Sequence, residues 1–381
     1  MTITDDSTRL GIVIRTATLS GLLLLSAAAL ANAQSPAGWR TDFSKHTVPL
    51  TEIVSGGPPK DGIPPVDRPK FESARAASSW LNGREPVVVV EAGGTARAYP
   101  LQILMWHEIV NDVIAGEPVS ITYCPLCNTA ITFSRRLGSD TTSFGTTGRL
   151  RLSDLVMYDR RTESWWQQAT GEGLVGQHAG EKLTRYPSTL VSFSEFRKQF
   201  PEGQVLSRNT GFSRDYGRTP YVRYDAENQS PIAGFFNRRP DPRLKAMERV
   251  GVVSRDDDRV IVPFSRLAKE KVVAAKVGQG PAVIWWIPGT ASSMDAPTIS
   301  EGKDVGAVAA FSPVVEGRTL TFKPADQTTF QDQETGTIWS FLGHGLTGPL
   351  AGKRLDHIEH GAYFWFAVAA FYENARLLTG R

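Results

Sequence analysis

The two cysteines of this chain form one Cys-x-x-Cys pair, Cys124-Pro-Leu-Cys127. Thiols at this spacing can reach each other, so the pair can form a disulfide, act as a redox dithiol, or supply half of a metal site. A disulfide across so short a loop contributes only about 2 kcal/mol in the chain-entropy model. Because exported paired thiols oxidise readily, the structural disulfide still stays among the alternatives.

A redox role would make Cys124 the nucleophile and Cys127 the resolving thiol of a thiol-disulfide oxidoreductase. In dithiol oxidoreductases the first thiolate is activated at a helix N-terminus. The residues after Cys127 instead alternate in the manner of a strand. This alternation weakens the redox interpretation without removing it.

A metal role fits a Cys-Pro-x-Cys turn between two strands, which resembles the knuckle of zinc ribbons and rubredoxins. A closed tetrahedral site needs two more ligands, and the chain has no second cysteine pair. His107, which precedes the strand leading to Cys124, is the best candidate for a third ligand, and Asn111 could orient its imidazole. Two thiolates and an imidazole suit zinc or cuprous copper. The alternative for His107 is a hydrogen-bonded core residue.

Two further groups of residues could bind ligands. His357 and His360 are three residues apart and could share a helix face, although turn and surface positions also fit them. Trp165, Tyr216 and Tyr221, with neighbouring arginines, could form a binding surface for a cell-envelope ligand. If the protein is such a ligand-binding module, the cysteine pair is expected to be a structural disulfide.

The elements that would position the cysteines follow from hydrophobic periodicity. A run of valines predicts a strand over residues 86–91, and four-residue spacing predicts a helix over residues 101–114. Alternation predicts strands over 119–123 and 130–134, so the cysteines should lie in a tight turn between two strands. Further strands are predicted over residues 155–158 and 164–168, and a short helix after Ser192. With 35 glycines and 24 prolines, the fold class is α+β and predominantly β.

The sequence also suggests an internal duplication. Residues 117–125 align with 280–288, and the Asp159, Thr162, Trp166 spacing recurs in Asp332, Thr335 and Trp339. We therefore predict two tandem copies, residues 80–206 and 250–378. In the second copy, Ile287 and Thr290 stand opposite the two cysteines. The first copy is thus expected to carry the chemistry.

The N-terminus predicts export. Arg9 and Arg15 precede an apolar run over residues 19–30, and Ala31-Asn-Ala33 fits a cleavage site, so residues 1–33 read as a signal peptide. An uncleaved anchor is the alternative. The mature protein is expected to be periplasmic or secreted, with no transmembrane span after cleavage. The later apolar run, residues 362–372, is shorter than the roughly 20 residues a span needs.

The amino-acid composition limits the classes of binding partner that we expect. Hydrophobic and charged contents of 41% and 21% are globular values. The net charge of +3 has mixed signs along the chain, and no basic tract indicates nucleic acid. The proline-rich segment 34–79 is expected to run as extended chain. The Arg/Tyr-rich segment 207–249, which joins the two copies, is expected to pack across their junction and line a surface groove.

The stretch Thr122-Tyr-Cys-Pro-Leu-Cys-Asn-Thr-Ala130 resembles the hallmark of a prokaryotic exported family, domain of unknown function 3179. Residues 107–112, 153–160 and 213–218 resemble the same family. The resemblance implies no established activity, but it implies that the cysteines, His107 and the turn over residues 154–160 form one functional locus. The further candidate site residues are Asn128, Thr129, Asp154, Asp159, Arg160 and Tyr216. For Asp154, Asp159 and Arg160, the alternative is a role in turn formation and solvation.

From the sequence we therefore expect an exported protein with a site centred on the cysteine pair. Its first expected role is metal binding, with zinc or copper, or redox accessory function. Its partner would be a small ligand or an envelope protein that handles metal or electrons.

Overall fold

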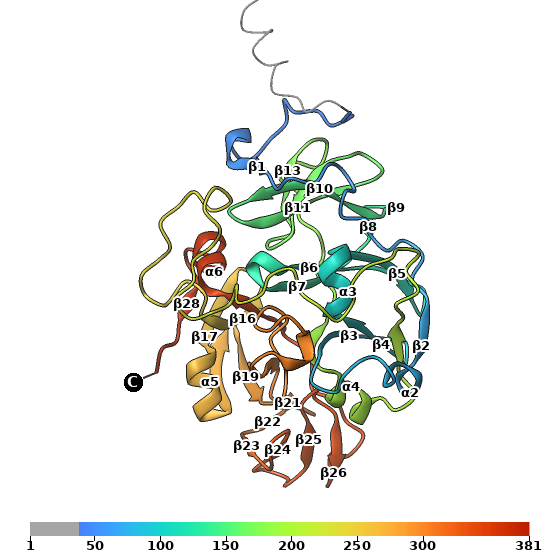
Figure 1. Cartoon of the computed structure of the whole chain (residues 1–381). Coiled ribbons are helices and arrows are strands. Elements are labelled where there is room, and N and C mark those ends of the chain that lie inside the picture. Colours follow the sequence, from blue (N-terminus) through green and yellow to red (C-terminus); the bar gives the residue numbers. More distant parts are fainter. Residues whose placement is uncertain (1–37, 381) are drawn as a thin grey trace, which may run out of the picture.

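The computed structural model describes residues 38–380, so the predicted signal peptide lies outside the described residues. The fold is predominantly β, as expected, and none of the helices among residues 38–380 is longer than seven residues. Small sheets are stacked along the molecule, and the strands from β23 (Phe322–Pro324) to β26 (Gly345–Thr347) form the end opposite β10 (Phe144–Arg151) to β13 (Gly173–Val175) (Figure 1). None of the described helices combines the length and the apolar character that crossing a bilayer requires.

The first half of the molecule, residues 86–206, contains three main sheets. Together with β1 (Ile53–Ser55) and β2 (Phe71–Ser73), edge strands from the preceding segment, their strand orders are β14-β3-β4-β15-β2, β5-β6-β7 and β1-β10-β11-β12-β13. Its elements are β3 (Pro86–Ala92), β4 (Thr95–Pro100), α3 (Leu101–His107), β5 (Ile109–Ile114), β6 (Glu117–Cys124), η2 (Pro125–Cys127), β7 (Thr129–Ser134), β8 (Arg136–Leu137), β9 (Asp140–Thr141), β10 (Phe144–Arg151), β11 (Asp154–Asp159), β12 (Trp165–Gln167), β13 (Gly173–Val175), β14 (Thr189–Ser192), α4 (Phe193–Gln199) and β15 (Gln204–Leu206).

The second half, residues 249–377, repeats this order of strands and helices. Its sheets are β27-β16-β17-β28, β18-β19-β20 and β23-β24-β25-β26. Its elements are β16 (Arg249–Arg255), β17 (Asp258–Pro263), α5 (Phe264–Glu270), β18 (Val272–Val277), β19 (Gly280–Ile287), η3 (Ile299–Glu301), β20 (Ala307–Phe311), β21 (Val314–Val315), β22 (Arg318–Thr319), β23 (Phe322–Pro324), β24 (Thr329–Asp332), β25 (Ile338–Ser340), β26 (Gly345–Thr347), β27 (Glu359–Phe364), α6 (Trp365–Phe371) and β28 (Arg376–Leu377).

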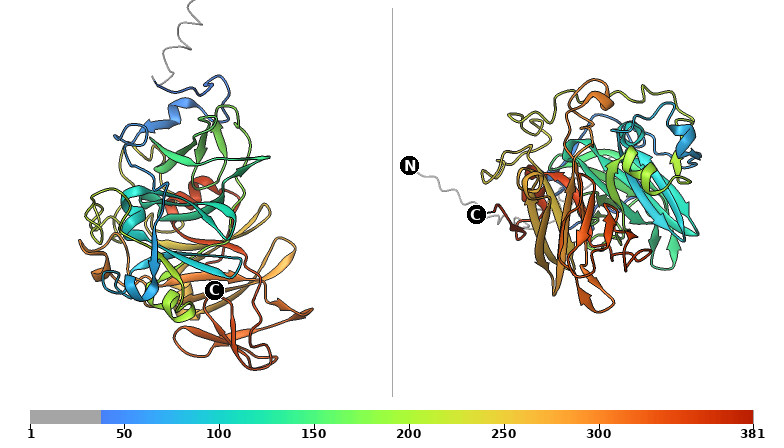
Figure 2. Two further views of the ribbon diagram at one scale, coloured as in Figure 1. Left: turned by 90° about the vertical axis from the view of Figure 1, so that its right-hand side faces the viewer. Right: turned by 90° about the horizontal axis from the view of Figure 1, so that it is seen from below.

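The two halves pack against each other reciprocally. Strand β7 contacts β27, and β14 contacts β20. Seen from below, the two halves lie side by side (Figure 2). One hydrophobic cluster includes Tyr123 and both cysteines from the first half together with Phe364 and Trp365 from the second. The cysteine turn is therefore part of a core to which both halves contribute.

The helix expected over residues 101–114 is half as long as predicted. Helix α3 ends at His107, Glu108 adopts a left-handed conformation with φ of 57°, and β5 follows directly. Ile109, Val110 and Val113 are β-branched, and such side chains pack well on a pleated surface. Pairing of β5 with β6 therefore overrides the four-residue apolar spacing.

Two long irregular segments cross these sheets. Residues 38–85 contain η1 (Leu50–Glu52), β1 (Ile53–Ser55), β2 (Phe71–Ser73) and α2 (Ala74–Ala77) and are otherwise largely extended. The connecting segment, residues 207–248, forms no regular strand or helix and touches both halves. Tyr224 donates a hydrogen bond to the Leu126 carbonyl in the first half, and the Arg223 amide donates to the Asp295 carbonyl in the second.

Candidate metal centre

The cysteines lie in a turn between two antiparallel strands, as the sequence predicted. Cys124 ends β6 and pairs with Thr129, the first residue of β7. The single turn η2 joins them, and Asn128 reverses the chain in the left-handed conformation with φ of 55°. Both thiols are free and buried, with at most 1% of either residue exposed. The turn thus aims two unbridged sulfur atoms into the interior.

A second turn brings the Asp154 carboxyl to the sulfurs. Arg151 of β10 pairs with Asp154 of β11, which leaves Leu152 and Ser153 as a two-residue hairpin loop. Both loop residues have positive φ, 51° and 66°, as a type I′ turn requires. Side chains other than glycine, asparagine and aspartate seldom adopt this conformation, and such local strain clusters at functional sites.

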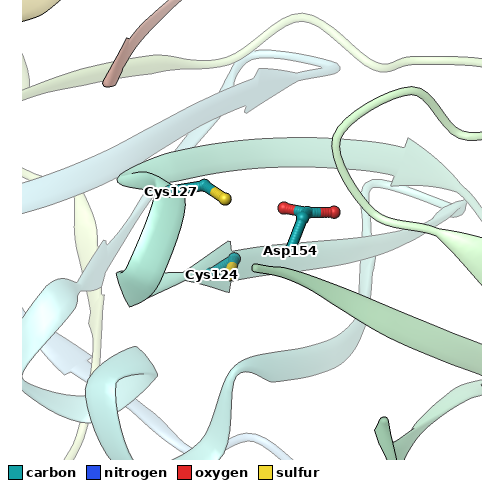
Figure 3. A group of neighbouring side chains, drawn as sticks. All are labelled: Cys124, Cys127 and Asp154. Atoms are coloured by element: carbon teal, nitrogen blue, oxygen red, sulfur yellow. The ribbon is translucent and has the colours of Figure 1, made fainter. Parts of the chain in front are cut away.

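The hairpin loop also directs a carbonyl at the sulfurs. The Ser153 carbonyl oxygen lies 3.4 Å from Cys127 Sγ and 3.8 Å from Cys124 Sγ. Ligand atoms of Cys124, Cys127 and Asp154 all lie within 4.8 Å of one another. In Figure 3 the Cys127 sulfur points toward the Asp154 carboxylate, with Cys124 beside them. Two loops distant in sequence therefore meet at one potential metal position.

The Asp154 carboxyl is held by neutral hydrogen-bond donors. Its Oδ1 accepts from Gln167 Nε2 at 2.7 Å and from the Ala169 amide at 2.9 Å. Its Oδ2 lies 3.3 Å from the Thr129 hydroxyl, which is closer to Gln168 Oε1 at 2.6 Å. Such outer contacts orient a metal-binding carboxylate and leave one oxygen free to coordinate.

Glu108 is a further acidic group near this cluster, within range of the charges of Asp154 and Cys124 but outside the group of three ligand atoms, and it is not among the site residues predicted from the sequence. It is 8% exposed, and burial together with the nearby Asp154 charge raises the pKa of Glu108 to about 8. The predicted helix over residues 101–114 gave no reason to place the Glu108 carboxyl beside the cysteine turn. The β-branched residues after Glu108 are the sequence signal that could have placed it at a helix end beside the cysteine turn.

Burial dominates the electrostatics of this cluster. It raises the pKa of Asp154 to about 6, against the hydrogen bonds from Gln167 and the Ala169 amide. Burial also raises the pKa of both thiols, and the charges of Asp154 and Glu108 raise the pKa of Cys124 further. Among residues 38–380, neither carboxyl forms a salt bridge. Ionising these buried groups is therefore unfavourable unless a cation joins the cluster.

The connecting segment covers the cluster. Tyr224 donates to the Leu126 carbonyl at 3.1 Å, directly within the cysteine turn. Burial raises the pKa of Tyr221, and the charges of Glu108 and Cys124 contribute to the shift. These tyrosines therefore close the site from the side of residues 207–248.

His107 lies outside this group of potential ligands, whose third member is Asp154. Its Nδ1 bonds the Pro64 carbonyl at 2.7 Å, and its Nε2 bonds the Tyr216 hydroxyl at 2.6 Å. Both ring nitrogens are thus engaged, and burial lowers the pKa of His107. The geometry matches the alternative of a hydrogen-bonded core residue. His107 and Tyr216 together anchor the connecting segment.

Two other candidates stabilise turns and strands. Asn111 accepts from the Phe144 amide at 3.0 Å and donates to the Phe144 carbonyl at 2.8 Å, which fastens β5 to β10. Asn128 donates to the Ala362 carbonyl of β27 at 2.8 Å. Both side chains therefore hold elements in place around the cysteine turn.

Asp159 and Arg160 have structural contacts of a different kind. Asp159 accepts from the Thr162 amide and from Trp166 Nε1, and Asp332 makes the matching bonds to Thr335 and Trp339 in the half without cysteines. This geometry needs no metal or thiol. Arg160 binds Asp67 at 2.5 Å and Asp61 at 3.7 Å, which ties the N-terminal segment to β11.

Replacing Tyr216 with phenylalanine should loosen the connecting segment without changing the cluster. The variant loses the hydroxyl that joins His107 Nε2 to Thr210 Oγ1. We expect limited proteolysis within residues 207–248 to become about three- to tenfold faster, the factor that one net hydrogen bond supplies. Tyr186→Phe is the matched control, because its hydroxyl makes no hydrogen bond among the described residues. Equal cleavage rates in both variants would contradict the anchoring role.

Comparison with known proteins identifies the family. Residues 60–375 match the family described as "Protein of unknown function (DUF3179)". Since this match covers most of the chain, the chain belongs to this family, as the cysteine hallmark indicated. No curated protein and no solved structure gave a significant match. The comparisons supply a family and no activity, so a functional proposal must rest on the site.

Proposed function

We propose that this protein binds a metal ion through Cys124, Cys127 and Asp154, with Glu108 as the fourth group. The supporting observation is the composition of the cluster: three acidic groups meet in the interior with the Glu108 carboxyl near them, and no lysine, arginine or histidine forms a salt bridge with either carboxyl in the described part of the chain. Burying such groups as anions is costly without a compensating positive charge. A divalent cation supplies that charge and uses each group as a ligand.

Zinc is the metal that this donor set favours. Zinc accepts both thiolate and carboxylate ligands and forms tetrahedral sites with four of them. Cuprous copper prefers soft donors, so the Asp154 and Glu108 carboxylates add little to its affinity. The buried, fully covered position fits a metal held for structure rather than one exposed to substrate.

Export strengthens the metal proposal. We place the mature protein outside the cytoplasm on the strength of residues 1–33, a placement that N-terminal sequencing of the mature protein tests. Adjacent free thiols in an oxidising compartment would form a disulfide unless something protects them. A bound metal provides that protection, because each sulfur is then held as a coordinated thiolate.

The second candidate is a thiol-disulfide oxidoreductase, favoured by the adjacent, unbridged thiols. Its chemistry requires a thiolate stabilised by a cation or a helix N-terminus. Here burial and two neighbouring carboxyls raise the pKa of Cys124, and only the single turn η2 follows it. The surroundings thus disfavour the reactive form of the nucleophile.

Elemental analysis of the untagged mature protein tests the proposal. We expect about one zinc per chain in the unsubstituted protein and a loss of at least tenfold in Cys124→Ser. Val119→Thr is the matched control, since it also places one new hydroxyl at a buried position of β6 and should keep its metal. Equal metal content in the Cys124→Ser and unsubstituted proteins would rule out the site. Metal-free protein whose thiols cycle reversibly would favour the oxidoreductase.

We also propose that the two halves arose by duplication and that only the first kept a metal site. The matching order of elements, the reciprocal packing and the shared Asp159/Trp166 and Asp332/Trp339 turns support it. Ile287 ends β19 where Cys124 ends β6, so the second half lacks the sulfur ligands. An experimental structure in which the two halves fail to superpose would contradict the duplication.

A further inference from the structure

A separate cavity lies at the junction of the two halves. It has a volume of about 140 Å³ and is bordered by β7, by the segment leading into β14 and by the segment leading into β27. The two segments occupy matching places in their halves, since Arg185 bridges to Phe133 of β7 and His357 bridges to Phe311 of β20. The residues lining the cavity are Ala130, Ile131, Thr132, Arg185, Tyr186, Pro187, Ser188, His357, Glu359, His360 and Tyr363.

The cavity is distinct from the proposed metal centre although both use β7. Successive side chains of a strand point to opposite faces. Thr129 lies beside Asp154, whereas Ala130 and Thr132 border the cavity. The two sites therefore lie on opposite faces of one strand.

Two polar atoms of the cavity lining are buried without a hydrogen-bond partner. They are the Thr132 hydroxyl, on a residue 1% exposed, and Nε2 of His357. Leaving buried donors or acceptors unpaired is unfavourable, so such atoms normally have a partner. Both atoms belong to side chains that border the cavity.

Of the two arrangements considered for His357 and His360, the structure excludes the shared helix face. His360 lies on strand β27 and His357 just before it, so they share no helix face. Their rings lie 4.5 Å apart, and His360 is already bonded at both nitrogens, to the Ile358 carbonyl and the Thr189 hydroxyl. One free imidazole nitrogen remains, which is too few ligands for a metal site.

The charges around the cavity cancel. Arg185 pairs with Glu359 at 2.7 Å and also donates to the Ala169 carbonyl. Burial and the adjacent His360 lower the pKa of His357 well below its ordinary value, so this imidazole is neutral at neutral pH. The cavity therefore offers hydrogen bonds without net charge, which disfavours an ion as the occupant.

We propose that this cavity binds a small uncharged molecule that carries a hydroxyl group on a ring-sized apolar frame. A cavity of about 150 Å³ holds benzene in another protein. The sides of Ala130, Pro187 and the Tyr186 ring suit an apolar frame. A hydroxyl both donates and accepts, so it can pair with His357 Nε2 and with the Thr132 hydroxyl.

Phenol and toluene are matched probes for this proposal, since they differ by one hydroxyl. Titration of the full mature protein, followed by calorimetry and by protein NMR, should show phenol binding at least about threefold more tightly than toluene. Thr132→Val keeps the side-chain shape. It should lower the affinity for phenol by about three- to tenfold and leave the affinity for toluene unchanged. Ala130→Leu should abolish binding of both probes by filling the cavity.

Metal content and near-ultraviolet circular dichroism identify variants that fail to fold. Thr132→Val and Ala130→Leu lie outside the proposed ligand set, so both should retain the metal of the unsubstituted protein. Equal affinity for phenol and toluene, no binding of either at millimolar concentration, or phenol binding that both variants leave unchanged would each overturn the proposal. The last result would identify binding elsewhere on the protein.

Discussion

Replacing Asp154 with asparagine should lower the zinc affinity of the protein by about 100-fold or more, measured by competition with a chelator of known affinity. Asparagine keeps the size of the side chain and can still accept at Oδ1 from Gln167 and the Ala169 amide. It removes the negative oxygen that faces the sulfurs. Loss of an outer hydrogen-bond partner of a metal ligand alone costs about 10- to 100-fold, so loss of the ligand itself should exceed that range.

The same competition assay separates the two candidates for the third ligand. His107→Asn retains a donor for the Pro64 carbonyl and removes the imidazole nitrogen that bonds Tyr216. If Asp154 is the ligand, this variant should change zinc affinity by less than about threefold. A large loss in His107→Asn together with a small loss in Asp154→Asn would restore the histidine site and refute the one proposed here.

The stability of the metal-free protein should fall as the pH rises from about 5 to about 8. The folded-state pKa of Asp154 is raised from 3.8 to about 6 and that of Glu108 from 4.5 to about 8, chiefly by burial. A raised pKa means that the folded protein binds the proton more tightly than the unfolded chain does. The stabilisation is therefore complete below the unfolded pKa values and is lost as pH passes through the folded ones.

Glu108→Gln isolates the larger of these two contributions. The amide cannot ionise, so the metal-free variant should be more stable than the metal-free parent at pH 8, by an amount on the order of a few kcal/mol. The difference should vanish near pH 5. Chemical denaturation of chelator-treated protein at several pH values measures it. Glu202→Gln, at an exposed position, is the control for a general effect of removing a carboxyl.

Zinc should reverse this pH dependence. Metal ligands bind in their deprotonated form, so zinc affinity rises with pH and the bound metal stabilises the fold most where the free carboxylates would destabilise it most. A metal-loaded protein that still loses stability between pH 5 and 8 would show that the ion does not bind at Asp154 and Glu108.

Local sequence patterns identified the parts of the site that depend on neighbouring residues. The alternating strands on either side of the cysteines predicted the turn correctly, because side-chain period and turn chemistry are properties of short segments. The hallmark around Cys124 and Cys127 also identified the family. The fold class was predominantly β, as the many short strands and the glycine and proline content indicated.

The sequence-based predictions failed where contacts between distant segments determine the local structure. Hydrophobic periodicity predicted that helix α3 continues to residue 114. Pairing with β6 instead makes residues 109–114 a strand. That change turned Glu108 into a helix end beside the cysteines. It also left His107 bonded to Pro64 and Tyr216, partners 43 and 109 residues away that no local pattern reveals.

The sequence by itself determined that two thiols meet in one turn of a predominantly β protein of this family. Only the tertiary structure decided which groups join them, because the Leu152-Ser153 loop brings Asp154 to the sulfurs from another sheet. The same holds for the cavity between the halves, whose unpaired atoms belong to Thr132 and His357, 225 residues apart in the sequence. The sequence specifies the chemistry of each side chain. The burial that raises a carboxyl pKa or leaves a hydroxyl unpaired arises only when distant segments pack together.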